Sequence, residues 1–70
     1  MNELAVRLQK LRESKRPLKS RRLTSELMGL HPNALQKYER GEAIPTADSL
    51  LKIADYYKVS VDYLLGRTNY

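Results

Sequence analysis

The sequence predicts an all-α fold, a compact five-helix bundle that forms a single domain over residues 1–70. Apolar residues recur three and four positions apart in successive segments, which is the spacing of one helix face. No segment alternates apolar and polar residues as a half-buried strand would. Residues that cap helices precede these segments, and glycine or proline ends them, so the helix boundaries can also be predicted.

The first helix is predicted over residues 3–14, with Asn2 as its N-cap. Its apolar side chains recur with helical spacing at Leu4, Leu8 and Leu11. Pro17 prevents the helix from continuing, because proline lacks the backbone N–H and restricts the residue before it. A basic connector therefore follows this helix.

The second and third helices are predicted to be short and close together. Ser20 is the candidate N-cap of the second helix, which carries the apolar residues Leu23, Leu27 and Met28 and ends at Gly29. After a tight turn, Pro32 is expected at the first position of the third helix, where its fixed φ is suitable and its missing N–H is not needed. This helix is expected to run to Glu39 or Arg40, before Gly41.

The fourth and fifth helices complete the bundle. Thr46 is the candidate N-cap of the fourth, which carries a broad apolar stripe made of Leu50, Leu51, Ile53, Ala54 and Tyr57. Ser60 is the candidate N-cap of a short fifth helix, "VDYLL", which Gly66 closes. Residues 67–70 are expected to be a frayed tail.

The basic residues are concentrated in the first part of the chain. The net charge is +5 and the pI is near 9.8, which is typical of domains that bind nucleic acid. Residues 1–40 hold 10 basic and 4 acidic side chains, whereas residues 41–70 hold 3 and 4. The segment "KRPLKSRR" gathers Lys15, Arg16, Lys19, Arg21 and Arg22. This density suits phosphates or an anionic membrane surface, and it is also compatible with a solvated face.

The composition argues against several other classes of protein. The chain has no cysteine, so it has no disulfide framework and no thiolate metal site. His31 is the only histidine and has no second histidine or cysteine with which to share a metal ion. Asp48, Asp55 and Asp62 fall on caps and exposed faces rather than as a catalytic pair. We expect no enzyme activity, no cofactor and no small-molecule substrate. Without a signal peptide or an apolar run long enough for a membrane span, the expected location is cytoplasmic.

The third predicted helix carries side chains that are suited to reading DNA. Leu35 and Tyr38, three positions apart, would anchor one face in the core. The opposite face carries Asn33, Gln36 and Lys37, whose amide and ammonium groups fit base edges in the major groove. A short helix, a turn containing glycine and a second helix match the helix-turn-helix arrangement, in which the second helix lies in the major groove.

The sequence resembles the phage repressor and Cro-like (Xre-type) helix-turn-helix domains over nearly its whole length. The most specific segments are "GLHPNALQKYERG", at the turn and recognition helix, and "YERGEAIPTADSLLKIADYYKVSVDYLLG", which runs to the end of the fifth helix. The resemblance implies a five-helix fold in which the second and third helices form the helix-turn-helix. It also implies a sequence-specific transcriptional regulator of the repressor type that binds double-stranded DNA.

The resemblance implies roles for individual residues. The base-reading set would be Asn33, Gln36 and Lys37, with His31 and Pro32 at the start of the recognition helix. The phosphate-contacting set would be Ser20 and Arg21 at the start of the second helix, their neighbours Lys19 and Arg22, and Arg40. Arg12 is expected to pair with Glu39.

Three features depart from the family pattern. The connector "SKRPLKS" is longer than usual. Thr24 and Ser25 take positions usually held by leucine and alanine. Leu23 and Leu27 stand where polar residues are common. This exchange suggests that the second helix is rotated or shifted by one residue. Pro32 replaces a polar residue that can touch DNA in relatives, so a contact would be lost there.

The predicted function is DNA-dependent control of transcription by a homodimer. The expected dimer contact is formed by Tyr63, Leu64 and Tyr70. The core or such a contact is also the expected place of Tyr56, Tyr57 and Tyr63, rather than a surface that stacks on single strands. The alternative is a protein-interaction module of the same fold, antitoxin-like or regulatory, with weak or no specific DNA binding. A third interpretation, a basic domain on anionic lipid, lacks a helix with a large apolar membrane face.

Overall fold

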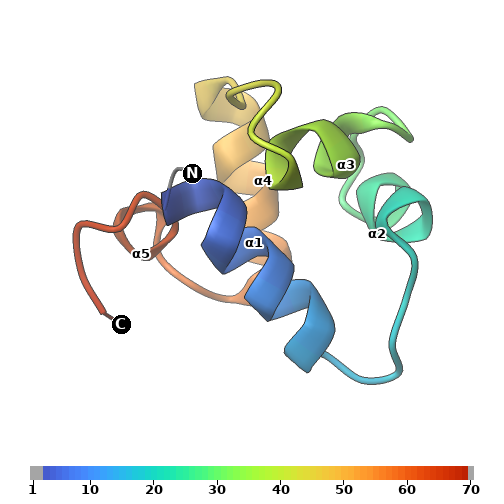
Figure 1. Ribbon diagram of the computed structural model, residues 1–70, viewed down its shortest axis with the longest axis horizontal. Helices are drawn as coiled ribbons and strands as arrows, with labels where there is room; N and C mark the ends of the chain where they lie inside the picture. The colour runs from blue at the N-terminus through green and yellow to red at the C-terminus, as the bar shows by residue number, and fades with distance from the viewer. Residues whose placement is uncertain (1–2, 70) are drawn as a thin grey trace.

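The computed structural model describes residues 3–69, and these contain five helices and no strand (Figure 1). The helices are α1 (Glu3–Ser14), α2 (Arg21–Leu27), α3 (Ala34–Glu39), α4 (Ala47–Tyr57) and α5 (Val61–Leu64). The prediction of an all-α five-helix fold is confirmed. Within residues 3–69 no helix has the length and apolar character needed to cross a membrane.

Side-chain caps start three of the helices as the sequence predicted. The hydroxyl groups of Ser20, Thr46 and Ser60 each accept a hydrogen bond from the backbone N–H three residues later, over 3.0, 3.2 and 3.0 Å. Each bond satisfies an N–H group that has no partner within its helix. The predicted stops are also confirmed, because the three glycines that follow α2, α3 and α5 have positive φ. The predicted cap Asn2 lies outside the described residues.

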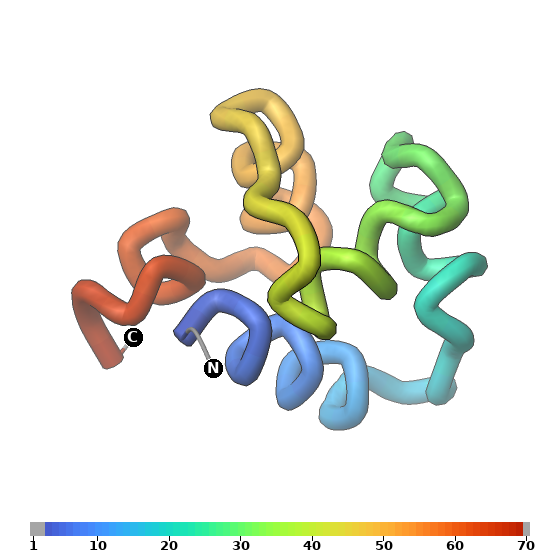
Figure 2. Tube along the Cα trace, turned by 45° about the horizontal axis from the view of Figure 1, so that its top comes forward, coloured from blue at the N-terminus to red at the C-terminus, as the bar shows by residue number. Residues whose placement is uncertain are grey.

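One hydrophobic core connects all five helices. Its buried members are Leu4 and Leu8 of α1, Met28 after α2, Leu35 of α3, Ile53 and Ala54 of α4, and Leu64 of α5. Tyr56, Tyr57 and Tyr63 are half-buried and pack against this core, as predicted. The first turns of α1 lie beside α5, and α3 packs against both α1 and α2 (Figures 1 and 2).

Two predicted apolar faces are wrong in part: Met28, Ile53 and Ala54 are buried as predicted, but three leucines are exposed. Leu23 and Leu27 of α2 are 43% and 52% exposed, whereas Thr24 and Ser25 are buried. The α2 helix is therefore not rotated away from the family pattern, and polar residues occupy its inner positions. Both hydroxyls donate to backbone carbonyls one turn earlier, over 2.7 and 2.8 Å, so their burial leaves neither unsatisfied. Leu51, predicted in the stripe of α4, is also exposed.

Arg7 holds the segment after α5 against α1. Its Nη1 donates to the carbonyls of Tyr63 and Thr68 over 2.7 and 2.6 Å, and its guanidinium lies 4.5 Å from the centroid of the Tyr63 ring. The prediction of a frayed tail is therefore wrong as far as Thr68. Leu64 is fully buried and cannot form the predicted dimer contact, while Tyr70 lies outside the described residues.

Candidate nucleic-acid interface

The turn between α2 and α3 is built around Gly29. This residue has a φ of +81°, a left-handed conformation that glycine adopts without steric cost. Its N–H donates to the carbonyl of Glu26 over 3.1 Å, and the N–H of Leu30 donates to the carbonyl of Ser25 over 2.9 Å. These two bonds form a Schellman motif, which satisfies the last carbonyls of α2 and redirects the chain towards α3.

The α3 helix begins at Ala34, two residues later than Pro32, where the sequence predicted its start. The reason is a separate turn, in which the Ala34 N–H donates to the carbonyl of His31 over 2.9 Å. The N–H of Asn33 also donates to Nδ1 of His31 over 3.1 Å. Asn33 is the N-cap residue, and its side chain makes no capping hydrogen bond, so it remains directed to the surface.

The first turn of α3 is capped by a residue of α2. The buried hydroxyl of Ser25 accepts a hydrogen bond from the Leu35 N–H over 3.0 Å and donates to the carbonyl of Arg21 over 2.8 Å. The Leu35 N–H is one of the amides for which the helix itself offers no acceptor. Ser25 therefore fixes α3 on α2. Sequence reasoning missed this role, although a serine at a position usually held by alanine was a signal of it.

Arg12 and Glu39 form the predicted ion pair between α1 and α3. Nε of Arg12 donates to Oε2 of Glu39 over 2.8 Å, and Nη2 donates to Oε1 over 3.1 Å. The Glu39 side chain is only 3% exposed. The hydrogen bond to Glu39 raises the pKa of Arg12, although burial acts in the opposite direction. Two parallel bonds of this kind restrict orientation, so the pair sets how α3 lies on α1.

The predicted base-reading residues all reach the surface on or next to α3. Asn33 and Lys37, one helical turn apart, are exposed, and so is His31 in the turn. These three side chains line one hollow of about 290 Å³. Gln36 and Pro32 are half-buried and lie outside the lining of this hollow. The structure therefore brings three of the five predicted residues together.

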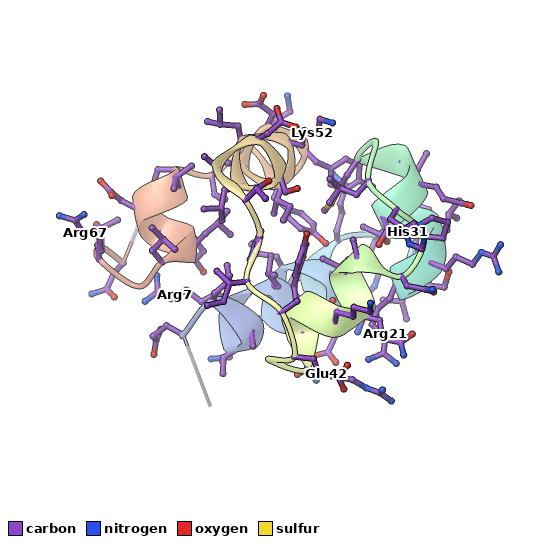
Figure 3. The ribbon with its side chains drawn as sticks, turned by 90° about the horizontal axis from the view of Figure 1, so that it is seen from above. Arg7, Arg21, His31, Glu42, Lys52 and Arg67 are labelled. Atoms are coloured by element: carbon purple, nitrogen blue, oxygen red, sulfur yellow. The ribbon has the colours of Figure 1, made fainter. Side chains whose placement is uncertain are left out.

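The predicted phosphate-contacting residues lie around the start of α2 and the end of α3. Arg22 and Arg40 form exposed ion pairs with Glu26 and Glu42, over 3.9 and 3.6 Å. Exposed pairs of this kind contribute little to stability, so either arginine can exchange its glutamate for a phosphate. Nζ of Lys19 donates to the carbonyl of Pro17 over 3.3 Å. Figure 3 shows Arg21 and His31 on one side of the molecule and Arg67 on the other.

The same turn and helices fall within the part of the chain that a family model recognises. A model described as "Helix-turn-helix" matches residues 8–64. The chain belongs to the helix-turn-helix family. In the described residues no group of three or more histidine, cysteine, aspartate or glutamate side chains could hold a metal ion.

Two curated relatives match more than half of this helix-turn-helix chain. The cryptic phage CTXphi transcriptional repressor RstR of Vibrio cholerae serotype O1 is 45% identical over 40 residues, which are 57% of this chain and 36% of RstR. The HTH-type transcriptional regulator ImmR of Bacillus subtilis is 44% identical over 43 residues, which are 61% of this chain and 34% of ImmR. The chain thus spans about a third of the length of each relative.

A solved structure has the same arrangement of helices. The P22 c2 repressor protein, crystallised in complex with synthetic operator 9T in the presence of Tl+, superimposes with a TM-score of 0.80. The alignment covers 97% of this chain and 100% of the P22 chain, with 26% sequence identity. The helix-turn-helix unit is therefore set in the repressor type of fold.

Proposed function

We propose that this helix-turn-helix protein is a sequence-specific transcriptional regulator of the repressor type that binds double-stranded DNA. The observation that supports this most strongly is the outward face of α3. Asn33 and Lys37 stand exposed on a helix whose inner side is fixed by Ser25 and by the Arg12–Glu39 pair. A helix held in this way suits the major groove, where base edges present distinct donor and acceptor patterns.

Each polar residue of this surface has a role that fits its chemistry. The Asn33 amide suits adenine and the Lys37 ammonium group suits guanine. His31 lines the same hollow, while Gln36 and Pro32 lie outside its lining. The Ser20 hydroxyl accepts from the Leu23 N–H and keeps its own proton for a phosphate oxygen. The phosphate contacts are completed by Lys19, Arg21, Arg22 and Arg40, which set the position of α3 on the duplex.

The protein would act as a homodimer on paired half-sites about one DNA turn apart, since two-fold symmetric repressors read such sites. Occupation of a promoter would block transcription. A regulator of this kind works in the compartment that holds the DNA, the cytoplasm of a bacterial cell. Near the predicted contact, Tyr63 is half-buried with the Arg7 guanidinium over its ring, so the exposed Leu65 offers more surface for the contact between two copies.

Selection of bound sequences from a random duplex pool tests the proposal. The selected duplex and a scrambled duplex are then titrated at two salt concentrations. We expect a palindromic site bound at least about a thousandfold more tightly than the scramble. If no motif emerges and the remaining binding disappears at physiological salt, the basic surface provides only non-specific attraction and the proposal is wrong.

Matched variants separate base contacts from phosphate contacts. Asn33→Ala is expected to cost about 1–3 kcal/mol on the selected site and to relax its sequence preference. Arg21→Ala should weaken binding to every duplex and reduce the slope of log K against log salt by about 1. Arg67→Ala removes the same charge on the opposite side of the molecule and should leave that slope unchanged (Figure 3).

A further inference from the structure

A small cavity lies between the end of α1, the connector after it, and the neighbouring parts of α2 and α4. Its volume of about 10 Å³ is close to the least that holds one particle of the size of a water molecule. Three of the seven residues that line it are cationic: Arg12, Lys15 and Lys19. Among the described residues, no aspartate or glutamate belongs to the lining. A very small volume is therefore surrounded by positive charge.

Both lysine side chains of the lining contact other residues of the lining. Nζ of Lys15 lies 5.0 Å from the centroid of the Tyr56 ring, and Nζ of Lys19 donates to the carbonyl of Pro17 over 3.3 Å. These contacts keep the two ammonium groups beside the cavity. A side chain that is already held in place loses less conformational freedom when a ligand binds, so the arrangement favours binding.

The hydroxyl of Tyr57 offers a further donor to the same cavity. Its oxygen is buried, and among residues 3–69 it has no hydrogen-bond partner. A buried polar group is costly without a partner, and an ion or a water molecule is one way to satisfy it. Burial raises the pKa of Tyr57, as does the charge of Glu39, whereas Arg12 lowers it, which places this ion pair near the hydroxyl. Since Arg12 and Glu39 neutralise each other, the excess charge comes from the two lysines.

We infer that this cavity binds a small monatomic anion, of which chloride is the common representative. Chloride only accepts hydrogen bonds, which matches the ammonium, guanidinium and tyrosine donors around the cavity. The buried Thr24 hydroxyl donates to the carbonyl of Ser20 over 2.7 Å, so it has no proton left for a ligand. An anion also gains from the charge of the lysines, which a water molecule does not. Phosphate and sulfate are too large for this volume.

A bound anion would attach the connector to the rest of the fold. Residues 15–19 are exposed or half-buried, so packing alone holds them weakly. An ion between Lys15, Lys19 and Tyr57 would join the connector to α4. It would also fix the start of α2, where Ser20 caps the helix. The inference is independent of the proposed function, because it requires no DNA.

Urea unfolding in mixtures of sodium chloride and sodium methanesulfonate tests the inference. The total salt concentration is kept constant, so that screening of charges is the same throughout, and methanesulfonate is too large for the cavity. A ligand that binds only the native state stabilises it by mass action. The folding equilibrium constant should therefore rise about twofold when chloride reaches its Kd, and further above it. Chlorine-35 NMR of the native protein should show line broadening over the same range.

Two variants locate the ion. Tyr57→Phe removes the buried donor and Lys15→Ala removes one charge, so both should lose most of the chloride dependence and of the line broadening. In methanesulfonate alone, Tyr57→Phe should be about as stable as the parent. Lys10→Ala is the matched control, because it removes the same charge from an exposed position of α1 outside the lining. It should keep both effects of chloride.

Two results would overturn the inference. Equal stability in the two salts without line broadening would show that the cavity binds no chloride. If chloride affects the parent, Tyr57→Phe and Lys15→Ala equally, the ion binds at another place. Lys15 is exposed, so its variant should fold and decides the question even if Tyr57→Phe does not fold. Neither result bears on the proposed function, since no duplex is present in these measurements.

Discussion

Arg12 of α1 and Glu39 of α3 are joined by two hydrogen bonds at a site where the carboxylate is almost completely buried. The pair links the first helix directly to the helix that carries Asn33 and Lys37. Its geometry therefore has two consequences, one for the stability of the fold and one for the orientation of the proposed DNA-binding surface.

Glu39→Gln should lower the free energy of unfolding by about 3 kcal/mol, because it leaves the Arg12 guanidinium without its counter-ion at a largely buried site. Urea unfolding at neutral pH measures this loss. Asp48→Asn is the control, since it breaks an exposed pair with Lys52 at 3.4 Å and should cost less than about 1 kcal/mol. Equal losses in the two variants would show that the buried pair contributes no more than a surface one.

Ser25→Ala should cost about 1–3 kcal/mol, because the Leu35 N–H is left without its acceptor at a buried site. The Leu35 amide should also exchange its hydrogen faster, and binding to the selected duplex should weaken because α3 loses its attachment to α2. Ser14→Ala is the control, since its exposed hydroxyl donates to the Lys10 carbonyl on the outside of α1. Unchanged exchange at Leu35 would contradict the assigned capping role.

Tyr57 should make the stability fall at alkaline pH. Burial raises the pKa of Tyr57, the negative charge of Glu39 raises it further, and Arg12 acts in the opposite direction. In the unfolded chain a tyrosine hydroxyl has a pKa of about 10. Above that pH the unfolded state therefore loses the Tyr57 proton, which the native state keeps. Stability therefore declines as pH rises above about 10, whereas Tyr57 has no effect on its pH dependence at lower values.

The Tyr57→Phe variant tests this expectation by urea unfolding across the alkaline range. The difference in free energy of unfolding between this variant and the parent should be constant below about pH 10. At higher pH the difference should change in favour of the variant. At neutral pH the substitution should cost less than about 1 kcal/mol, because among residues 3–69 the buried hydroxyl has no hydrogen-bond partner to lose. If the stabilities of the two proteins change with pH in parallel, the pKa of Tyr57 is not raised in the folded state.

Gly66→Ala should be more destabilising than Gly29→Ala. Both glycines have a left-handed φ, +79° and +81°, which costs an alanine roughly 1–2 kcal/mol. A Cβ at Gly66 would also lie 2.8 Å from Cγ and 2.9 Å from Cβ of Glu3, whereas one at Gly29 would meet no described atom within 4 Å beyond its own residue and its two chain neighbours. The melting temperatures of the two variants measure the difference. Equal losses would mean that Glu3 moves away from the new Cβ without cost.

The local features of this fold could be predicted from the sequence because their causes are local. Ser20, Thr46 and Ser60 cap helices through N–H groups three residues away, and the positive φ of each glycine follows directly from its place after a helix. The pairing of Arg12 with Glu39 was predicted by family resemblance. These features depend on neighbours in the sequence or on a known pattern.

The remaining features depend on contacts between distant segments. Leu23 and Leu27 were predicted inside because they are apolar, but the packing of α2 on α3 turns Thr24 and Ser25 inward. Arg7 binds carbonyls that are 56 and 61 residues away, so no local pattern marks it. Ile44 lines the hollow beside α3 only because the loop after this helix returns the chain to it. The base-contacting and phosphate-contacting roles stay predictions until they are measured.

The cap that α2 supplies to α3 bears on how this protein can evolve. Six residues are too few to form a stable helix alone, so α3 depends on inner-side contacts at Ser25, Leu35 and Glu39. Asn33 and Lys37 stand outside these contacts. Under the proposed function, substitutions at the outer positions would change which DNA sequence is bound while folding is preserved, and one scaffold would give rise to many specificities.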